Sequence, residues 1–145
     1  MSNEELMKIC INEAKKCYKS NDVPVGAIIV KDGKVIAKAH NQREKCSKTC
    51  AHAEILAIEQ SNKKLHSSRL DGFDIYVTKE PCLMCMGAIL SARIRKIYFG
   101  AEDKRFGTKD LAVDNNFNHK CEIEGGILKT ECEELLTNFF RSLRK

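Results

Sequence analysis

The chain has 145 residues, enough for one domain with a buried core and too few for two domains that each have a core of ordinary size. Hydrophobic residues make up 43% and charged residues 31%, as in a soluble globular protein, and the net charge of +5 permits an anionic partner without establishing nucleic-acid binding. No stretch has the apolar length of a secretion signal or a membrane span, so we expect a cytoplasmic protein without a membrane segment. The eight cysteines then favour free thiols or metal ligands over a disulfide framework.

The chain is expected to begin with a helix and a hairpin. Ser2 and Glu5 have the spacing of a capping box, so a helix should follow them. Residues 25–30 are almost continuously apolar, which indicates a strand buried on both faces. Asp32 and Gly33 supply a tight turn, and residues 35–39 should return as the antiparallel partner strand.

The middle of the chain alternates helix and strand. A polar, basic loop over residues 41–49 precedes a helix that passes through Ile55 and Glu59, and residues 61–71 are expected to be a connector. Residues 75–77 are typical of a strand.

The second half is expected to contain two more helices and two more strands. Pro81 should start a helix, where its missing N–H costs nothing, and residues 82–91 are apolar all round, which predicts a buried helix. A strand over residues 97–99 precedes a polar loop over residues 100–118 and an edge strand near residues 121–123. The last helix carries an apolar stripe of Leu128, Cys132, Leu135, Leu136, Phe139, Phe140 and Leu143.

This alternation of helices and strands predicts the α/β class, with one central sheet covered by helices on both faces. No linker, repeat or low-complexity stretch divides it, so residues 1–145 are expected to form a single domain. In such sheets, ligands bind at strand ends, where the N-termini of helices point.

A metal site is indicated by Cys82 and Cys85, which are three residues apart and share one face of a helix. His52, about 30 residues earlier, supplies a third ligand, and three protein ligands with one open position are typical of catalytic zinc. Glu54 is then the candidate general acid and base for a zinc-activated water. Because residues two apart on a regular helix face different ways, His52 and Glu54 can reach one water only at the first turn.

Other interpretations of these residues remain open. The spacing of Cys82 and Cys85 alone also fits a redox pair or a structural zinc knuckle. Cys46 or Cys50 could act as a fourth ligand, which would close the site and make it structural.

His-x-Glu followed by Pro-Cys-x-x-Cys is the established signature of zinc deaminases. Beyond this signature, nearly the whole chain resembles bacterial tRNA-specific adenosine deaminases. The resemblance is carried by Val23-Pro24-Val25-Gly26-Ala27, Asn41, His52-Ala53-Glu54-Ile55, Thr78-Lys79-Glu80-Pro81-Cys82-Leu83-Met84-Cys85-Met86-Gly87-Ala88, Phe99-Gly100-Ala101, Asn118-His119, Gly126-Ile127-Leu128 and Phe139-Phe140-Arg141.

The resemblance implies a cytidine-deaminase-like fold, a three-layer α/β/α sandwich around a mixed sheet of about five strands. It also implies a homodimer with one zinc ion per subunit, held by His52, Cys82 and Cys85, and conversion of the wobble adenosine of a tRNA anticodon to inosine. In this chemistry a zinc-activated hydroxide attacks C6 of the flipped-out adenine, while Glu54 protonates N1 and then assists departure of ammonia.

The resemblance further implies where substrate binds. Asn41 would hydrogen-bond the base, Val25 would pack against the base or ribose, and the backbone at Ala53 and Pro81 would border the pocket. The last helix, with aromatic and basic groups suited to single-stranded RNA, would meet the anticodon loop through Phe139, Phe140, Arg141, Arg144 and Lys145.

Two further positions, Asp103 and His119, resemble family positions near the RNA, although a loop-capping carboxylate and a surface histidine are the plain alternatives. The chain departs from the family pattern over residues 103–117, which look shorter and read Phe106-Gly107-Thr108-Lys109-Asp110. Cys46 and Cys50 also lie outside the family motif.

Two competing functions remain at this point. A deaminase of a free base or nucleoside, such as guanine or cytidine, would use the same metal chemistry, and only the basic balance and the aromatic C-terminal helix favour RNA. A non-catalytic, zinc-stabilised RNA-binding module is the second competitor, but it would have no use for Glu54 beside an open coordination position.

Overall fold

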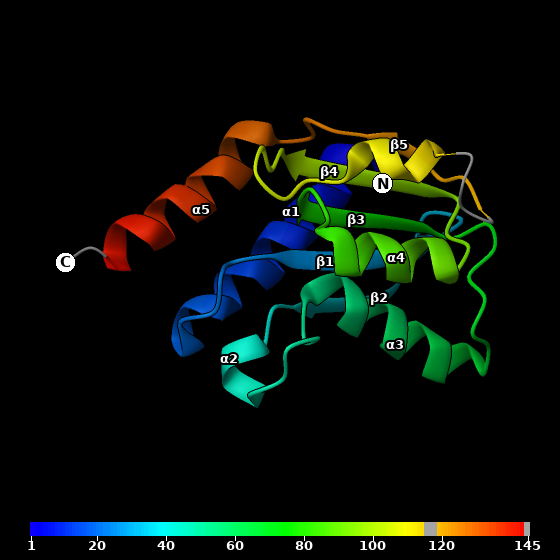
Figure 1. Ribbon diagram of the computed structural model, residues 1–145, viewed down its shortest axis with the longest axis horizontal. Coiled ribbons are helices and arrows are strands. Elements are labelled where there is room, and N and C mark those ends of the chain that lie inside the picture. Colours follow the sequence, from blue (N-terminus) through cyan, green and yellow to red (C-terminus); the bar gives the residue numbers. More distant parts are fainter. Residues whose placement is uncertain (115–118, 144–145) are drawn as a thin grey trace.

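In the computed structural model, which describes residues 1–114 and 119–143, five strands form one mixed sheet in the order β2-β1-β3-β4-β5 (Figure 1). Strand β1 pairs antiparallel with β2 and β3, whereas β3, β4 and β5 run parallel to one another. The strands are β1 (Gly26–Lys31), β2 (Lys34–His40), β3 (Asp74–Lys79), β4 (Lys96–Ala101) and β5 (Glu122–Glu124). The predicted mixed sheet of about five strands is confirmed.

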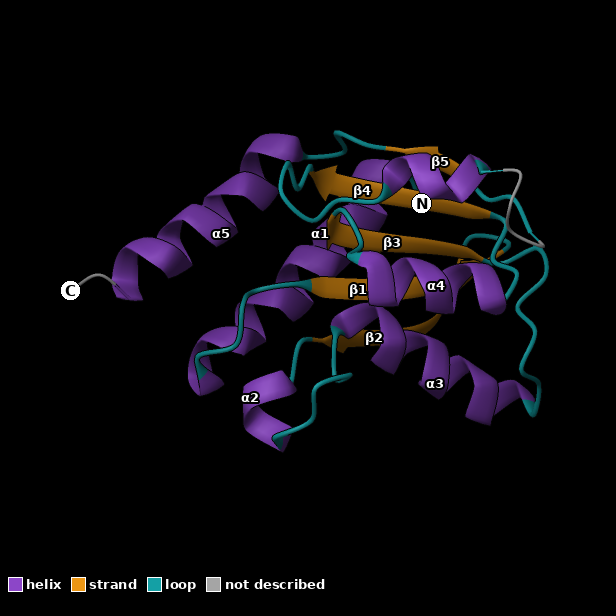
Figure 2. Cartoon of the chain, in the orientation of Figure 1, coloured by secondary structure: helices purple, strands orange, loops and turns teal. Residues whose placement is uncertain are grey.

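Helices cover both faces of the sheet (Figure 2). Helices α3 (Ala53–Leu65) and α4 (Leu83–Ser91) lie on one face, and α1 (Asn3–Ala14) lies on the other with the first half of α5 (Lys129–Leu143). In β1, Ala27 and Ile29 join one apolar cluster while Ile28 and Val30 join the cluster on the opposite face. The strand is therefore buried on both faces, as predicted, and the three-layer architecture follows from this.

The N-terminal expectations are also confirmed. Ser2 caps α1: its Oγ accepts the N–H of Glu5 at 3.1 Å, and the Glu5 carboxylate accepts the N–H of Ser2 at 3.2 Å. The chain continues as a 3₁₀ helix, η1 (Lys15–Ser20). Between β1 and β2, Asp32 and Gly33 have φ values of 49° and 76°, the positive pair that a two-residue hairpin turn requires.

Two segments that were expected to be loops contain helical turns. A short helix, α2 (Arg43–Cys46), lies within residues 41–49 because the buried Asp22 carboxylate accepts the N–H groups of Glu44 and Lys45, at 2.6 and 3.3 Å. A 3₁₀ helix, η2 (Lys109–Val113), lies within residues 100–118. The local sequence does not indicate α2, because the Asp22 carboxylate that binds its first turn lies about 20 residues earlier in the chain.

The connector expected over residues 61–71 is wrong at its start. Helix α3 runs on to Leu65 and ends at His66, whose φ is 51°. Ser61 is fully buried inside the helix, and its hydroxyl donates to the carbonyl of Ala57 at 3.0 Å. The polar Ser-Asn step is therefore part of the helix, because a serine hydroxyl can be satisfied one turn back.

Helix α4 is not buried all round, contrary to the expectation from its composition. Cys85, Met86, Ile89 and Leu90 are buried, whereas Leu83 is 67% exposed and Gly87 is exposed as well. The helix packs on the sheet, α3 and η2, and no described residue covers its remaining apolar face. Pro81 lies just before the N-cap, Cys82, and not in the first turn.

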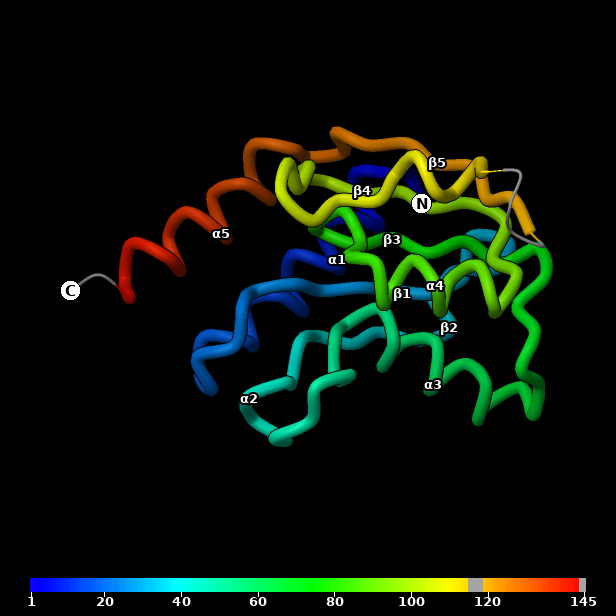
Figure 3. The backbone as a smooth tube through the Cα atoms, viewed as in Figure 1, coloured from blue at the N-terminus to red at the C-terminus, as the bar shows by residue number. Residues whose placement is uncertain are grey.

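Several strand ends and helix starts lie together where β3 and β4 end. The carboxyl ends of β2, β3 and β4, the amino end of β1 and the starts of α3 and α4 are all on this side of the sheet, and α5 extends past it (Figure 3). Ligands of α/β sheets bind beyond the carboxyl ends of the strands.

The two outer strands carry charged side chains. Lys34 and Lys38 are exposed on β2, and Glu122 and Glu124 are exposed on the three-residue β5. No helix in the described parts of the chain has the length and apolar character needed to cross a membrane.

Candidate active site

Three metal-ligand side chains meet where α3 and α4 begin. His52 is the N-cap of α3, Cys82 is the N-cap of α4, and Cys85 lies in the first turn of α4. The Nδ1 atom of His52 is 3.7 Å from Sγ of Cys82 and 3.5 Å from Sγ of Cys85. Within residues 1–114 and 119–143, this is the one cluster of three potential ligands whose donor atoms all lie within 4.8 Å of one another.

The distances between these atoms fit a shared metal ion. With about 2.3 Å from zinc to sulfur and about 2.0–2.1 Å to nitrogen, two donors of a tetrahedral site lie about 3.5 Å apart. The donor set of one imidazole and two thiols therefore suits a metal ion.

The electrostatics of the three ligands favour a cation. The hydrogen bonds from Cys85 and His52 lower the pKa of the Cys82 thiol to about 3, and the bond to Cys82 together with burial raises the pKa of Cys85. The hydrogen bond to Cys82 raises the pKa of His52. The hydrogen bonds among the three groups thus favour a thiolate at Cys82, which is the form of cysteine that binds a metal ion. The positive ends of α3 and α4 also stabilise thiolates.

Glu54 lies next to these ligands in the first turn of α3. His52 has extended backbone angles, φ −82° and ψ 150°, so it stands outside the helix while Glu54 is inside it. Residues two apart in a regular helix face different ways, so His52 and Glu54 can reach the same water because His52 lies outside the helix. Glu54 is only 4% exposed, and burial raises the pKa of its carboxyl group.

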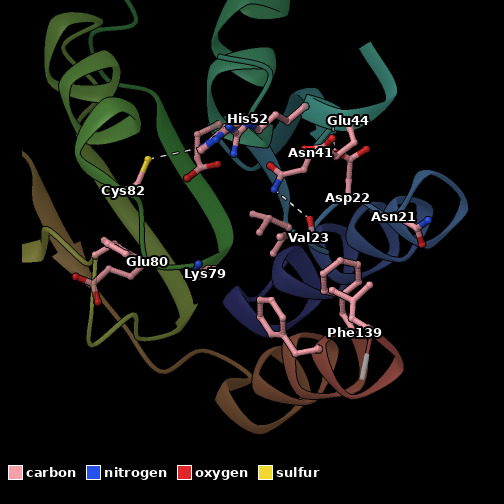
Figure 4. A pocket seen from close by; sticks show the side chains of 16 residues that line it. Asn21, Asp22, Val23, Asn41, Glu44, His52, Lys79, Glu80, Cys82 and Phe139 are labelled. Atoms are coloured by element: carbon pink, nitrogen blue, oxygen red, sulfur yellow. Dashed lines mark hydrogen bonds between the residues drawn. The ribbon is translucent and has the colours of Figure 1, made fainter. Parts of the chain in front are cut away.

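A cavity of about 500 Å³ opens beside the metal ligands (Figure 4). His52 and Cys82 face each other across its inner end, and Asn41 and Phe139 border it from other elements. Its described lining is Asn21, Asp22, Val23, Val25, Asn41, Arg43, Glu44, His52, Glu54, Lys79, Glu80, Cys82, Phe106, Phe139, Phe140 and Leu143. The volume lies within the usual range for sites that bind small molecules.

Asn41 ties two walls of the cavity together. Its Oδ1 accepts the N–H of Ala53 at 2.7 Å, and its Nδ2 donates to the carbonyl of Val23 at 3.0 Å. The amide nitrogen carries a second hydrogen, which these bonds do not use. Asn41 thus fixes the start of α3 and keeps a donor for a ligand.

The predicted substrate residues fall into three groups, of which two lie at or directly behind the cavity wall. Val25, Asn41, Phe139 and Phe140 line the cavity together with Glu54 and two of the metal ligands, His52 and Cys82. Ala53 and Pro81 are buried behind it and act through their backbone: the N–H of Ala53 binds Asn41, and the carbonyl of Pro81 accepts the hydroxyl of Thr108 at 3.0 Å.

The other predicted substrate residues lie outside this lining. Asp103 caps its own loop by accepting the N–H groups of Arg105 and Phe106, and it pairs with Lys79 at 3.0 Å. His119 hydrogen-bonds the carbonyl of Ile94 at 2.8 Å, beyond the far end of α4. Arg141 is exposed on α5, and Arg144 and Lys145 fall outside the described residues.

Sequence analysis did not single out Glu80 or Phe106, which both line the cavity. Glu80 is buried and accepts the N–H groups of Asp103 and Lys109, at 3.1 and 2.9 Å. Its position directly before Pro81-Cys82 was the one available signal. Phe106 lay in a loop whose path the sequence did not indicate.

Cys46 and Cys50 do not join the metal ligands. Both are exposed, and the thiol of Cys46 donates to the side chain of Gln42 at 3.4 Å. The alternative of a closed site with one of them as a fourth ligand is therefore wrong for the described structure.

Comparison with known proteins gives consistent matches over the whole chain. The model of the MafB19-like deaminase family matches residues 1–144. The tRNA-specific adenosine deaminase of Bacillus subtilis (strain 168) is 45% identical over 150 residues, covering 100% of this chain and 93% of that protein.

Solved structures agree with this match. A structure from a study of A-to-I editing by tRNA:A34 deaminases at the wobble position of transfer RNA superposes with a TM-score of 0.88 at 36% identity, covering 91% of this chain and 99% of that chain. A guanine deaminase from Bacillus subtilis is also 36% identical, but its TM-score is 0.66 and it covers 70% of this chain and 66% of that chain. Because the matches in sequence and structure extend over nearly the whole chain, the chain belongs to the family of tRNA-specific adenosine deaminases.

Proposed function

We propose that this protein is a zinc-dependent hydrolase that converts the wobble adenosine of a tRNA anticodon to inosine and releases ammonia. The observation that carries the proposal is that His52, Cys82 and Glu54 line one cavity, while the buried Cys85 completes the ligand cluster with His52 and Cys82. This set of groups is the one that hydrolytic nucleobase deamination uses.

The four residues divide two tasks, since three of them bind the metal and the fourth transfers protons. His52, Cys82 and Cys85 hold the metal, and imidazole with two thiolates favours zinc over hard cations such as Mg²⁺. Zinc, when bound, acts as a Lewis acid that lowers the pKa of the attacking water toward neutral pH. Glu54 takes a proton from that water, passes it to N1 of the adenine as C6 is attacked, and then assists protonation of the departing amino group. One water is consumed and one ammonia is released.

The cavity walls suit a flipped-out base. Val25 offers an apolar surface, and the unused hydrogen of the Asn41 amide can donate to a ring nitrogen of the base. Because Asn41 is fixed to Val23 and Ala53, its donor stays in place without further ordering.

The outer part of the cavity suits RNA better than a free base. Phe139 and Phe140 of α5 line it, and Arg141 is exposed on the same helix. An unpaired base can stack on Phe140, which is 45% exposed, while basic groups contact the phosphates. A free guanine or cytidine would leave these side chains unused, and a non-catalytic zinc module would have no use for a buried Glu54.

We further propose a cytoplasmic homodimer in which residues 1–145 form one catalytic domain and bind one zinc ion per subunit. The uncovered face of α4 supports the dimer, because Leu83, Met84 and Ala88 present apolar surface there. A second copy of the chain is the partner that would cover it.

The reaction is tested with a transcribed anticodon stem-loop that carries a wobble adenosine, measured by ammonia release and by mass spectrometry for inosine. Adenosine, guanine and cytidine serve as free substrates in parallel. We expect inosine from the stem-loop and little turnover of the free compounds. Turnover of a free base alone would keep the metal chemistry but overturn the RNA substrate.

A further inference from the structure

The loop after β4 places an exposed aromatic ring at the edge of the cavity. Phe106 is 62% exposed and lines the cavity that also contains Glu54 and His52. The guanidinium group of Arg105 lies 5.3 Å from the centre of the Phe106 ring. The cation therefore lies over one face of the aromatic ring, which leaves the opposite face for another flat group.

Hydrogen bonds to the side chain of Glu80 fix the loop that carries Phe106. The Glu80 carboxylate is buried and accepts backbone N–H groups on both sides of Phe106, from Asp103 at 3.1 Å and from Lys109 at 2.9 Å. The hydroxyl of Thr108 adds a bond to the carbonyl of Pro81 at 3.0 Å. Because Pro81 directly precedes Cys82, the loop is fixed to the segment that carries the metal ligands.

Gly107 and Asp103 set the path of the loop. A Cβ atom at Gly107 would overlap the carbonyl oxygen of Asp103 and the carboxylate of Glu80, so only glycine lets the chain pass this close. Asp103 accepts the N–H groups of Arg105 and Phe106, at 3.0 and 2.9 Å. Its charge is matched by Lys79 at 3.0 Å, so it does not repel a phosphate strongly.

We propose that Phe106 is a stacking platform for an unpaired base next to the reacting adenosine, with Arg105 beside the phosphate that links the two nucleotides. This inference rests on the proposed function, since it requires a substrate with more than one nucleotide. Every base has a flat face that stacks on an aromatic ring, so the contact tolerates different sequences. Glu80 is a positioning residue, which acts by holding the loop and not by touching the base.

The geometry favours a nucleobase as the occupant for two reasons. The ring borders the same cavity in which the reacting base is bound, so a neighbouring nucleotide arrives with the substrate. Lys104 and Arg105 add positive charge to the same loop, where the RNA backbone would lie.

Kinetics test the platform with Phe106→Leu, Phe106→Trp and the control Val113→Ala. Val113 is exposed on η2, close in sequence, but it is not part of the described cavity lining. We expect Phe106→Leu to raise KM for the stem-loop roughly tenfold with little change in kcat, Phe106→Trp to restore it, and Val113→Ala to behave as wild type. An unchanged KM in Phe106→Leu would overturn the platform.

Fluorescence tests stacking without turnover. A stem-loop with 2-aminopurine on the 5′ or the 3′ side of the wobble position is bound to Glu54→Ala, alone and combined with Phe106→Leu. We expect binding to Glu54→Ala to quench the probe at one of the two positions, and the added Phe106→Leu change to remove most of that quenching. Equal quenching in both proteins at both positions would overturn the proposal.

The role of Glu80 is tested by a double-mutant cycle. Glu80→Gln should raise KM in the wild-type background and have little further effect in Phe106→Leu, since both changes remove the same contact. A full additional loss would overturn the positioning role. Failure of the proposed function is distinguishable: wild-type protein would then make no inosine from any RNA, whereas failure of the platform alone would leave inosine formation intact and insensitive to Phe106.

Discussion

His52 and Cys82 occupy the N-cap positions of α3 and α4, where Ser, Thr, Asp or Asn usually accept a backbone N–H. In the described structure neither side chain makes such a capping bond. Both side chains turn toward Cys85 instead. These helix starts are thus built for ligand binding, and part of their stability is expected to come from the bound metal.

Glu54→Ala separates chemistry from metal binding. Because Glu54 moves protons and is not a ligand, we expect turnover to fall about 10²–10⁴-fold while metal content and thermal stability are kept. Single-turnover kinetics on the stem-loop and elemental analysis of the purified protein measure the two properties. Loss of the metal together with activity would mean that Glu54 has been assigned the wrong role.

Cys85→Ser tests the ligand set. Cys85 is buried with its sulfur 3.5 Å from His52 Nδ1, so removing the thiolate should abolish stoichiometric metal binding and lower the melting temperature. A chelator should lower the melting temperature of wild type in the same way.

The matched control for this experiment is Cys46→Ser. Cys46 is an exposed thiol outside the ligand cluster, so its substitution should leave metal content unchanged. Stoichiometric metal in Cys85→Ser, or its loss in Cys46→Ser, would contradict the ligand assignment.

At the scale of elements, α5 serves two purposes along its length. Cys132 and Leu135 pack on the sheet near its start. Toward its end Phe139 remains buried at 4% exposure, whereas Phe140 is 45% exposed and Leu143 is exposed too. The apolar stripe predicted from spacing is therefore part core and part cavity wall.

This division predicts opposite results for two neighbouring phenylalanines. Phe139→Ala should lower the free energy of unfolding by about 3–5 kcal/mol, because it removes a buried ring. Phe140→Ala should change stability little and weaken binding of the stem-loop. Urea denaturation and equilibrium binding measure these effects. Equal destabilisation by both changes would show that Phe140 belongs to the core.

The elements that sequence predicted well are those with local signals. The capping box at Ser2 and the turn at Asp32 and Gly33 specify their structures within a few residues. Helix α2 and the end of α3 were missed for the opposite reason, since they depend on Asp22 and on the buried environment of Ser61. Such contacts form only after distant segments come together.

The same distinction applies to the site. The grouping of His52, Cys82 and Cys85 could be predicted because metal ligands are restricted to a few residue types, and the structure brings these three together. The position of Glu80 and Phe106 on the cavity could not be predicted, because it depends on how the loop after β4 packs against the segment before Cys82. His119 illustrates the reverse, because a resemblance in sequence pointed to substrate while its side chain binds Ile94 at the far end of α4.

At the scale of the whole molecule, the uncovered face of α4 predicts how two copies associate. If two copies associate through this face, as we propose, Leu83→Asp should give a monomer, because it places a charge on the surface where Leu83 is 67% exposed in one chain. Sedimentation velocity measures the mass. Leu65→Asp is the control, because Leu65 is an exposed leucine at the C-terminal end of α3, on a different helix from Leu83. A wild-type monomer, or a Leu83→Asp dimer, would contradict this interface.

The charged outer strands limit how the protein can assemble. Sheets polymerise when the free edge of one copy accepts a strand from another, the process that leads to fibrils. Here an added strand would meet Lys34 and Lys38 at one edge and would find only the three residues of β5 at the other, where Glu122 pairs with Arg95 and Glu124 with Lys96. Copies of this chain are therefore guided toward contacts between helices, and concentrated solutions should resist fibril growth even though the sheet itself is rich in aliphatic side chains.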